Sequence, residues 1–184
     1  MTKSAIHSMY FLAIVCPGPI NDEVLQFKNR MRDQFGCRVA LKSPAHITLI
    51  APFWLNQERE EELLEAIQSF TSDMDEIEIN LDGFFHFGNR VLFVNVRMNP
   101  ALEELKNQVQ DYFVRSFSDI IGKDERPFHP HITIANRDLK PGDFLKAWEY
   151  FSKKEFKEMF RAKTIALLKL TEGKWNMVSE CNWQ

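Results

Sequence analysis

The chain carries one short motif twice, and this repetition is the strongest constraint on its fold. His-Ile-Thr followed by an aliphatic residue stands at 46–49 and again at 131–134 in a sequence of 184 residues. Both copies lie in apolar runs rich in β-branched residues, which are typical of strands. A motif that recurs at this separation indicates two related halves, each of which contributes a strand to a shared structure.

The first half of the chain divides into strands and helices by its hydrophobic periodicity. Residues 9–16 predict a buried strand that ends at the Pro-Gly-Pro sequence which follows. Apolar side chains at steps of three and four then predict an amphipathic helix from about 20 to 35, with Gly36 just past its end. After the first motif we expect a helix at about 57–70 and an alternating strand at 76–81.

The second half repeats this series of elements. A turn at 87–90 predicts a hairpin, and residues 91–96 predict its second strand. Pro100, at a first helical position, opens a helix that leads through a charged stretch to the second motif. A helix near 143–152 and two strands near 163–170 and 175–183 complete the chain. Strand, helix, motif strand and helix thus occur about twice, which predicts a duplicated, two-lobed α+β fold.

Length and composition indicate one two-lobed domain over residues 1–184. The content of 45% hydrophobic and 27% charged residues is that of an ordinary globular protein. No segment approaches the roughly 18 apolar residues that a membrane span needs. The apolar run at 9–16 lacks the small residues of a signal cleavage site, so we expect a strand there.

Charge and cysteine content limit the partners and the compartment. The net charge of −3 disfavours a protein that grips long nucleic acids, but it is compatible with a small phosphorylated ligand or an RNA end. The three cysteines, Cys16, Cys37 and Cys181, follow no zinc or CxxC spacing. We therefore expect free thiols in a reducing compartment, the cytoplasm.

Alternation along a strand places the imidazole and the hydroxyl group of each motif on the same face. The first motif should hold His46, Thr48 and Ile50 on one face and Ile47, Leu49 and Ala51 on the other. The second motif should pair His131 with Thr133 and turn Ile132 and Ile134 into the core. Each motif strand thus has a polar face backed by an aliphatic one, as expected of a strand that lines a cleft.

Two histidines that face each other can serve as an acid and a base. Imidazole titrates near neutral pH, so one ring can accept a proton while its partner donates one. This is the requirement for in-line displacement at phosphorus. The threonine hydroxyl groups, about 7 Å along each strand from the histidines, can donate hydrogen bonds to the non-bridging phosphate oxygens. Such a mechanism needs no metal.

These residues resemble the signature of the 2H phosphoesterases, which include the bacterial 2′-5′ RNA ligases and 2′,3′-cyclic nucleotide phosphodiesterases. The HxTx motifs are "HITL" at 46–49 and "HITI" at 131–134, and a short apolar strand precedes the first. Ala45 and Pro130 stand just before the two motif histidines, as in the family. The resemblance implies a bilobal fold with pseudo-twofold symmetry, in which two antiparallel sheets flank a central cleft and helices lie outside.

The resemblance also implies the roles of the four motif residues. His46 and His131 would be the general base and acid, and Thr48 and Thr133 would bind the phosphate. The expected reaction is hydrolysis of a 2′,3′-cyclic phosphate on a nucleotide or RNA end, with 2′-5′ RNA ligation as its reverse. The family uses no metal and no exogenous cofactor. We expect a monomer with no membrane association and no obligatory protein partner.

Two other functions are compatible with the same residues. The chain could be a non-catalytic module that binds a phosphate or an RNA end in the same cleft. It could also be a metal-dependent phosphodiesterase, because His129 stands two residues from His131. Turnover separates the first alternative from an enzyme, and sensitivity to chelators separates the second.

Several further residues have two interpretations. His7 and His86 are expected to be structural or exposed. Phe128 and Trp175 belong either to the core or to a surface that stacks on a base. Five basic residues could place charge near a phosphate, although most such residues are solvated surface: Lys42, Arg90, Arg97, Arg126 and Arg137.

Overall fold

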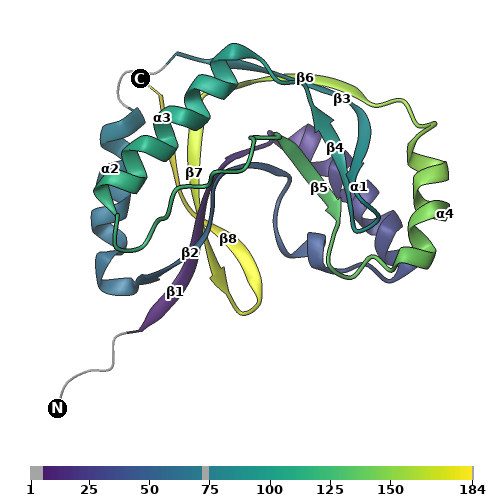
Figure 1. The fold of residues 1–184 in the computed structure, drawn as a ribbon, viewed down its shortest axis with the longest axis horizontal. Coiled ribbons are helices and arrows are strands. Elements are labelled where there is room, and N and C mark those ends of the chain that lie inside the picture. The colour runs from purple at the N-terminus through teal and green to yellow at the C-terminus, as the bar shows by residue number, and fades with distance from the viewer. Residues whose placement is uncertain (1–5, 72–74, 184) are drawn as a thin grey trace.

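Antiparallel sheets form the framework of the chain (Figure 1). The computed structural model describes residues 6–71 and 75–183, and within them it has two four-stranded sheets. The first sheet has the order β2 (His46–Asn56), β1 (His7–Val15), β7 (Thr164–Thr171) and β8 (Lys174–Asn182). The second has the order β5 (His131–Ala135), β4 (Val91–Val96), β3 (Ile77–Phe87) and β6 (Lys157–Ala162).

Two helices each pack beside the sheet to which the preceding strand does not belong. Helix α1 (Gly18–Phe35) follows β1 but lies beside the second sheet, and α3 (Pro100–Ser116) follows β4 but lies beside the first (Figure 1). The Phe27 ring of α1 meets Phe84 of β3 with centroids 5.0 Å apart, and Phe156, just before β6, at 5.1 Å. One hydrophobic cluster accordingly contains residues of both sheets.

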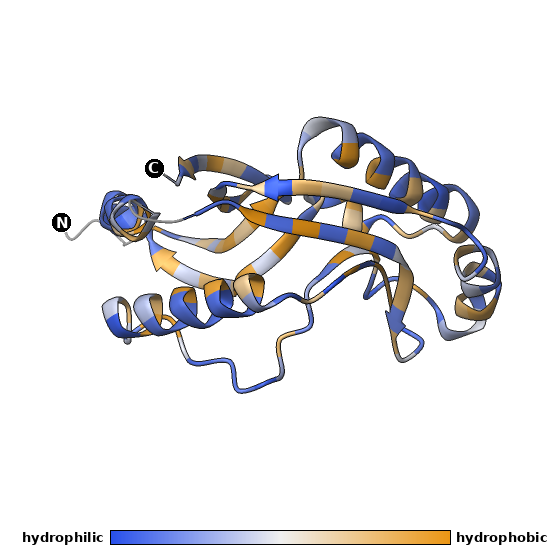
Figure 2. Ribbon diagram, turned by 90° about the horizontal axis from the view of Figure 1, so that it is seen from above, coloured by the Kyte–Doolittle hydropathy of each residue, from blue (hydrophilic) through white to orange (hydrophobic). Residues whose placement is uncertain are grey.

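The remaining helices cover the outer surface. Helix α2 (Glu60–Thr71) contacts β7 and β8, and α4 (Pro141–Phe151) places Trp148 against Phe85 of β3. In Figure 2 hydrophobic and hydrophilic residues alternate along the helices, as expected of helices that bury one face. Within the described residues, no helix is long and apolar enough to cross a membrane.

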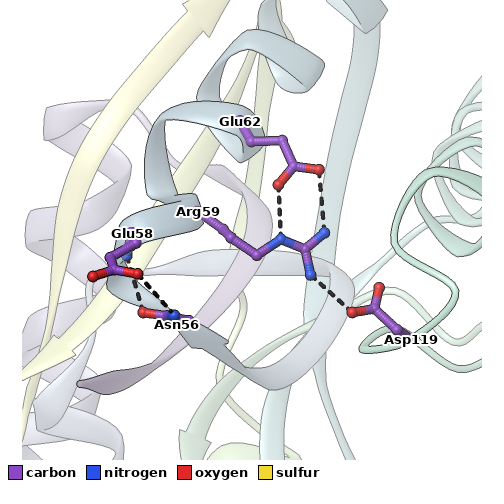
Figure 3. A network of polar contacts seen from close by, with 5 residues as sticks. All are labelled: Asn56, Glu58, Arg59, Glu62 and Asp119. Carbon is purple, nitrogen blue, oxygen red and sulfur yellow. Dashed lines mark hydrogen bonds and ion pairs between the residues drawn. The ribbon is translucent and has the colours of Figure 1, made fainter. Parts of the chain in front are cut away.

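A polar network joins the start of α2 to the segment after α3 (Figure 3). Arg59 donates to Glu62 from Nε at 2.7 Å and to Asp119 from Nη1 at 2.8 Å. The side chain of Asn56 accepts from the Glu58 backbone N–H at 3.1 Å and caps this turn. These ion pairs are exposed, so each contributes little to the stability of the fold.

The sequence predictions agree with most of the elements, and the two-lobed α+β architecture is confirmed. Gly36 ends α1 in the left-handed conformation with φ of 73°, as its position predicted. The hairpin between β3 and β4 is also present. Strand β6 was not predicted, because its sequence KEMFRA is half charged and buries only Phe160 and Ala162. Cys16, Cys37 and Cys181 are free thiols.

The predicted faces of β2 are wrong beyond Leu49. Ile50 was expected on the polar face and Ala51 in the core, but Ile50 is buried and Ala51 is exposed. The reason is a β-bulge: Ala13 of β1 pairs with Thr48, whereas Leu12 pairs with Ile50, so Leu49 is an extra residue in the ladder. A bulge reverses the alternation for the residues that follow it.

One carboxylate links the segments that flank the two motifs. Oδ2 of Asp138, three residues after β5, accepts hydrogen bonds from the backbone N–H groups of Arg38 at 2.5 Å and Val39 at 2.9 Å. Val39 begins the short 3₁₀ helix Val39–Lys42, and Arg38 precedes it; this helix leads toward β2. Asp138 therefore links the segment that precedes the first motif to the segment that follows the second motif.

We predict that Asp138→Ala lowers the free energy of unfolding by about 1–3 kcal/mol, because it leaves two backbone donors without their charged acceptor. Urea denaturation would measure this change. Asp111→Ala is the matched control, since Asp111 is exposed on α3. Equal unfolding free energies for the two variants would contradict a linking role for Asp138.

Candidate active site

The two motifs meet where the edges of the sheets face each other. Strands β2 and β5 are the edge strands of their sheets, and they contact one another. His46 and His131 are the first residues of these strands. Burial is the main cause that lowers the pKa of His46, and electrostatic interaction with His131 contributes in the same direction, so the two imidazoles lie close enough to interact. The fold thus brings together the two histidines that the sequence singled out.

Both histidines are oriented by the same backbone device. Nδ1 of His46 lies 2.8 Å from the carbonyl oxygen of Pro44, and Nδ1 of His131 lies 2.6 Å from that of His129. A carbonyl oxygen only accepts, so Nδ1 must carry the proton in each ring. In the neutral form Nε2 then holds a free lone pair. Each ring is therefore set to take or give a proton at Nε2.

Aromatic rings fix the position of each imidazole. The Phe11 ring of β1 lies 4.8 Å from that of His46, between centroids. On the second sheet, Phe87 and Phe93 each lie 5.0 Å from His131. Packing on one side and a backbone hydrogen bond on the other restrict the rotamers of both histidines.

Both histidines favour the neutral form in the free protein. Burial lowers the pKa of His46 to about 4, and the positive charges of Lys28 and His131 act in the same direction against the Pro44 hydrogen bond. Burial and the neighbouring His129 also lower the pKa of His131, although its hydrogen bond to the His129 carbonyl raises it. A bound phosphate anion would favour the imidazolium form and raise both values.

Lys28 is an unexpected charge beside the first motif. It lies on α1 with 3% of its surface exposed, and its Nζ donates to the Ser43 carbonyl at 2.9 Å. Burial lowers its pKa to about 8. Within residues 6–71 and 75–183 it forms no ion pair, so its charge acts on His46 without compensation by a carboxylate.

The threonines flank the histidines as predicted. Thr48 pairs with Ala13 and Thr133 pairs with Phe93, and both side chains are partly exposed. Thr48 and His131 open onto a cavity of about 480 Å³, whereas His46 and Thr133 do not line it. Its wall continues toward α3 through Lys106, Asp124, Arg126 and Phe128. The cavity therefore extends to one side of the histidine pair.

The other histidines that the sequence singled out differ in their positions relative to the cavity. His129 is exposed and contributes its carbonyl to His131. His86 packs against Trp148 of α4 with centroids 4.7 Å apart, in agreement with a structural role. In the described part of the chain, no group of three or more His, Cys, Asp or Glu side chains is placed to hold a metal ion.

The basic and aromatic candidates have separate environments. Arg126 lies beside the cavity in an ion pair with Asp124, whereas Arg97 pairs with Asp82. Phe128 lines the cavity, and the Trp175 ring lies 4.7 Å from that of Phe11. The remaining basic candidates are exposed: Lys42, Arg90 and Arg137.

Sequence reasoning missed Phe11, Lys28 and Lys106. Lys28 follows Phe27 and stands four residues after Val24, so it lies on the apolar stripe of its helix. A charged residue at such a position was a usable signal for a buried functional group. Lys106 stands next to the stripe of α3, where solvated lysines are common. Nothing in the local sequence distinguishes it from them.

The chain is similar to known proteins over most of its length. The model of the 2′-5′ RNA ligase superfamily matches residues 20–174. The Geobacillus kaustophilus (strain HTA426) protein named "Putative phosphoesterase GK0864" is 26% identical over 174 residues, which are 91% of this chain and 92% of that protein.

Solved structures share the fold. Escherichia coli LigT complexed with 3′-AMP has a TM-score of 0.70 at 20% identity, covering 97% of this chain and 99% of that chain. The protein TT0787 of Thermus thermophilus has a TM-score of 0.65 at 17% identity, covering 95% of this chain and 97% of that chain. At these identities the comparison establishes a common architecture.

We predict that Lys28→Met raises the pKa of His46, because it removes a positive charge that disfavours the imidazolium form. Imidazole NMR titration of the variant and of the unaltered protein would measure this shift. Lys42→Met is the matched control, since Lys42 is exposed and does not contribute to the shift of His46. An unchanged His46 titration in a folded Lys28→Met protein would refute the electrostatic coupling.

Proposed function

Because the chain belongs to the 2′-5′ RNA ligase superfamily, we propose that it is a metal-independent phosphoesterase that hydrolyses 2′,3′-cyclic phosphates on a nucleotide or an RNA end. The observation that carries this proposal is the matched pair of histidines on facing edge strands. Each has its Nδ1 proton held by a backbone carbonyl, which leaves Nε2 for chemistry. The similarity to phosphoesterases over most of the chain supports the same reaction class.

The geometry supports acid and base catalysis with distinct roles. We assign His46 as the base, because burial lowers its pKa to about 4 and keeps its ring neutral, so Nε2 is free to accept a proton. Nε2 of His46 takes a proton from water as the water oxygen bonds to phosphorus. The bond from phosphorus to a ribose oxygen breaks, and Nε2 of His131 protonates that oxygen. The bound phosphate anion favours the imidazolium that His131 needs for this role.

The threonines stabilise the charge that develops on phosphorus. The hydroxyl groups of Thr48 and Thr133 donate to the non-bridging oxygens as the pentacoordinate transition state forms. The same steps with a 5′-hydroxyl group in place of water as the nucleophile open the 2′,3′-cyclic phosphate at its 3′ oxygen and form a 2′-5′ diester without ATP, which is 2′-5′ ligation. Hydrolysis is favoured because water is the abundant nucleophile.

The cleft and the relatives support a nucleotide as the substrate. LigT structures contain 3′-AMP, NADP+ and ATP, so a protein of the same fold accommodates nucleotides. We extend this to a phosphorylated nucleotide or RNA end here. The free thiols fit a reducing compartment, and we propose a cytoplasmic monomer that needs no protein partner.

We predict that the protein turns over at least one 2′,3′-cyclic mononucleotide in excess EDTA. His46→Ala and His131→Ala should each lower kcat by about 10²-fold or more, as expected for a lost acid or base. Circular dichroism would show that each variant folds. Binding without turnover in the unaltered protein would instead favour the non-catalytic module.

The variant His129→Ala separates the metal-dependent alternative. The hydrogen bond that orients His131 comes from the backbone carbonyl of His129, which His129→Ala retains, so this variant should lose much less activity than His131→Ala. A metal site built on both side chains predicts similar losses for the two variants and activity that returns only with added metal. That result would exclude the metal-independent mechanism.

We predict that Thr48→Val and Thr133→Val each lower kcat by about 10²-fold, because each removes one donor to the transition state. The isosteric valine preserves volume, and Thr→Ser at the same positions restores the hydroxyl group. Steady-state kinetics should therefore show recovery of kcat in the serine variants. A loss confined to KM in the valine variants would contradict transition-state stabilisation.

A further inference from the structure

Lys106 presents a positive charge to the cavity. It lies on α3, and its Nζ donates to the Leu49 carbonyl at 2.9 Å and to Oε1 of Gln110 at 2.8 Å. Both acceptors are neutral, and within the described residues Lys106 forms no ion pair. Burial lowers its pKa, which shows that its charge is incompletely solvated. A partly buried cation without a carboxylate partner would gain from an anionic ligand.

The hydrogen bonds of Lys106 leave one donor unused. A lysine ammonium has three N–H donors, and Leu49 and Gln110 occupy two of them. The bond to Leu49 also anchors the ammonium one residue from Thr48, where consecutive Cα atoms are about 3.8 Å apart. Lys106 and Thr48 both line the cavity, so one ligand bound there can contact both side chains.

The charged groups at Lys106 give this wall of the cavity a net positive charge. Asp124 raises the pKa of Lys106 and Arg126 lowers it, so both groups lie within electrostatic range. The carboxylate of Asp124 is bonded to Arg126 at 2.7 Å. One carboxylate thus faces two cations, and one positive charge is uncompensated at this end of the cavity.

The cavity is larger than a single phosphate requires. Its volume of about 480 Å³ lies in the range of 300–1,000 Å³ that is usual for small-molecule sites. Phe128 supplies an aromatic surface in the wall, and its ring centroid lies 5.9 Å from Nζ of Lys106. The same cavity is thus lined by Thr48, His131, the aromatic ring of Phe128 and the ammonium group of Lys106.

Resting on the hydrolase function above, we propose that Lys106, with Arg126 beside it, binds a second phosphate of the substrate. The preferred substrate then carries a phosphate besides the cyclic one. It is a nucleoside 2′,3′-cyclic phosphate with a phosphate on its 5′ side, which is either a terminal 5′-phosphate or the diester of an oligonucleotide. The charged hydrogen bond to that phosphate makes Lys106 a specificity-determining residue.

Substrate preference tests this site. kcat/KM would be measured for adenosine 2′,3′-cyclic phosphate, its 5′-phosphorylated form and the dinucleotide ApA with a 2′,3′-cyclic end. The unaltered protein should favour at least one of the two larger substrates by about tenfold or more, and the favoured one identifies monoester or diester. Lys106→Met should bring this ratio close to one, whereas Lys153→Met, at an exposed lysine in the turn after α4, should preserve it.

A binding measurement separates this site from the hydrolase function. Calorimetry would compare adenosine 2′-monophosphate with adenosine 2′,5′-bisphosphate, neither of which can be turned over. A bisphosphate preference of about tenfold that disappears in Lys106→Met supports the site even if the protein hydrolyses no cyclic phosphate. When the dinucleotide is the favoured substrate, the criterion is the ratio of kcat/KM values between the dinucleotide and adenosine 2′,3′-cyclic phosphate, in place of the affinity for the bisphosphate.

Three results would overturn the proposal. The first is equal kcat/KM for all three substrates together with equal affinity for the two adenosine phosphates. The second is a Lys106→Met variant that loses activity equally on every substrate, because Lys106 would then only tie α3 to β2. The third is an unaltered protein that binds neither adenosine phosphate and hydrolyses none of the substrates.

Discussion

The packing of α1 beside the second sheet and of α3 beside the first determines where the two motif strands lie relative to each other. No backbone ladder joins β2 to β5, since the two strands belong to different sheets. Their relative position depends instead on side-chain packing, which includes the Phe27 ring of α1 against the second sheet. Asp138 adds a polar tie between the same halves. A cleft built in this way is as rigid as the aromatic core that fills the space behind it.

The backbone orients the two motif histidines in the same way, but their neighbouring side chains differ. The same carbonyl-to-Nδ1 contact orients both imidazoles, so the duplicated backbone treats them alike. Their neighbours differ: His46 has Phe11 and the charge of Lys28, whereas His131 has two phenylalanines and His129. Different surroundings for two histidines in a near-symmetric site suit a reaction with one proton donor and one acceptor.

Local sequence determined the elements but not their contacts. The repeated motif and the helical periodicities were sufficient to predict the two-lobed fold and to single out the four motif residues as candidates, because each motif and each helical pattern lies within a short stretch of sequence. The bulge at Leu49 depends on pairing with β1, and β6 is a strand only because it pairs with β3. Asp138 and Lys106 are significant through partners about 100 and 57 residues away, which no local pattern encodes.

The choice of orienting groups has an electrostatic consequence. Many catalytic histidines are held by a carboxylate, which would place a fixed negative charge next to the reacting phosphate. In the part of the chain that the structure describes, both Nδ1 atoms bond to main-chain oxygens, which orient the rings with only a partial charge. An anionic ligand that approaches Nε2 is therefore not repelled from behind the imidazoles. Because these oxygens belong to the backbone, the orientation also persists when the side chains at positions 44 and 129 vary.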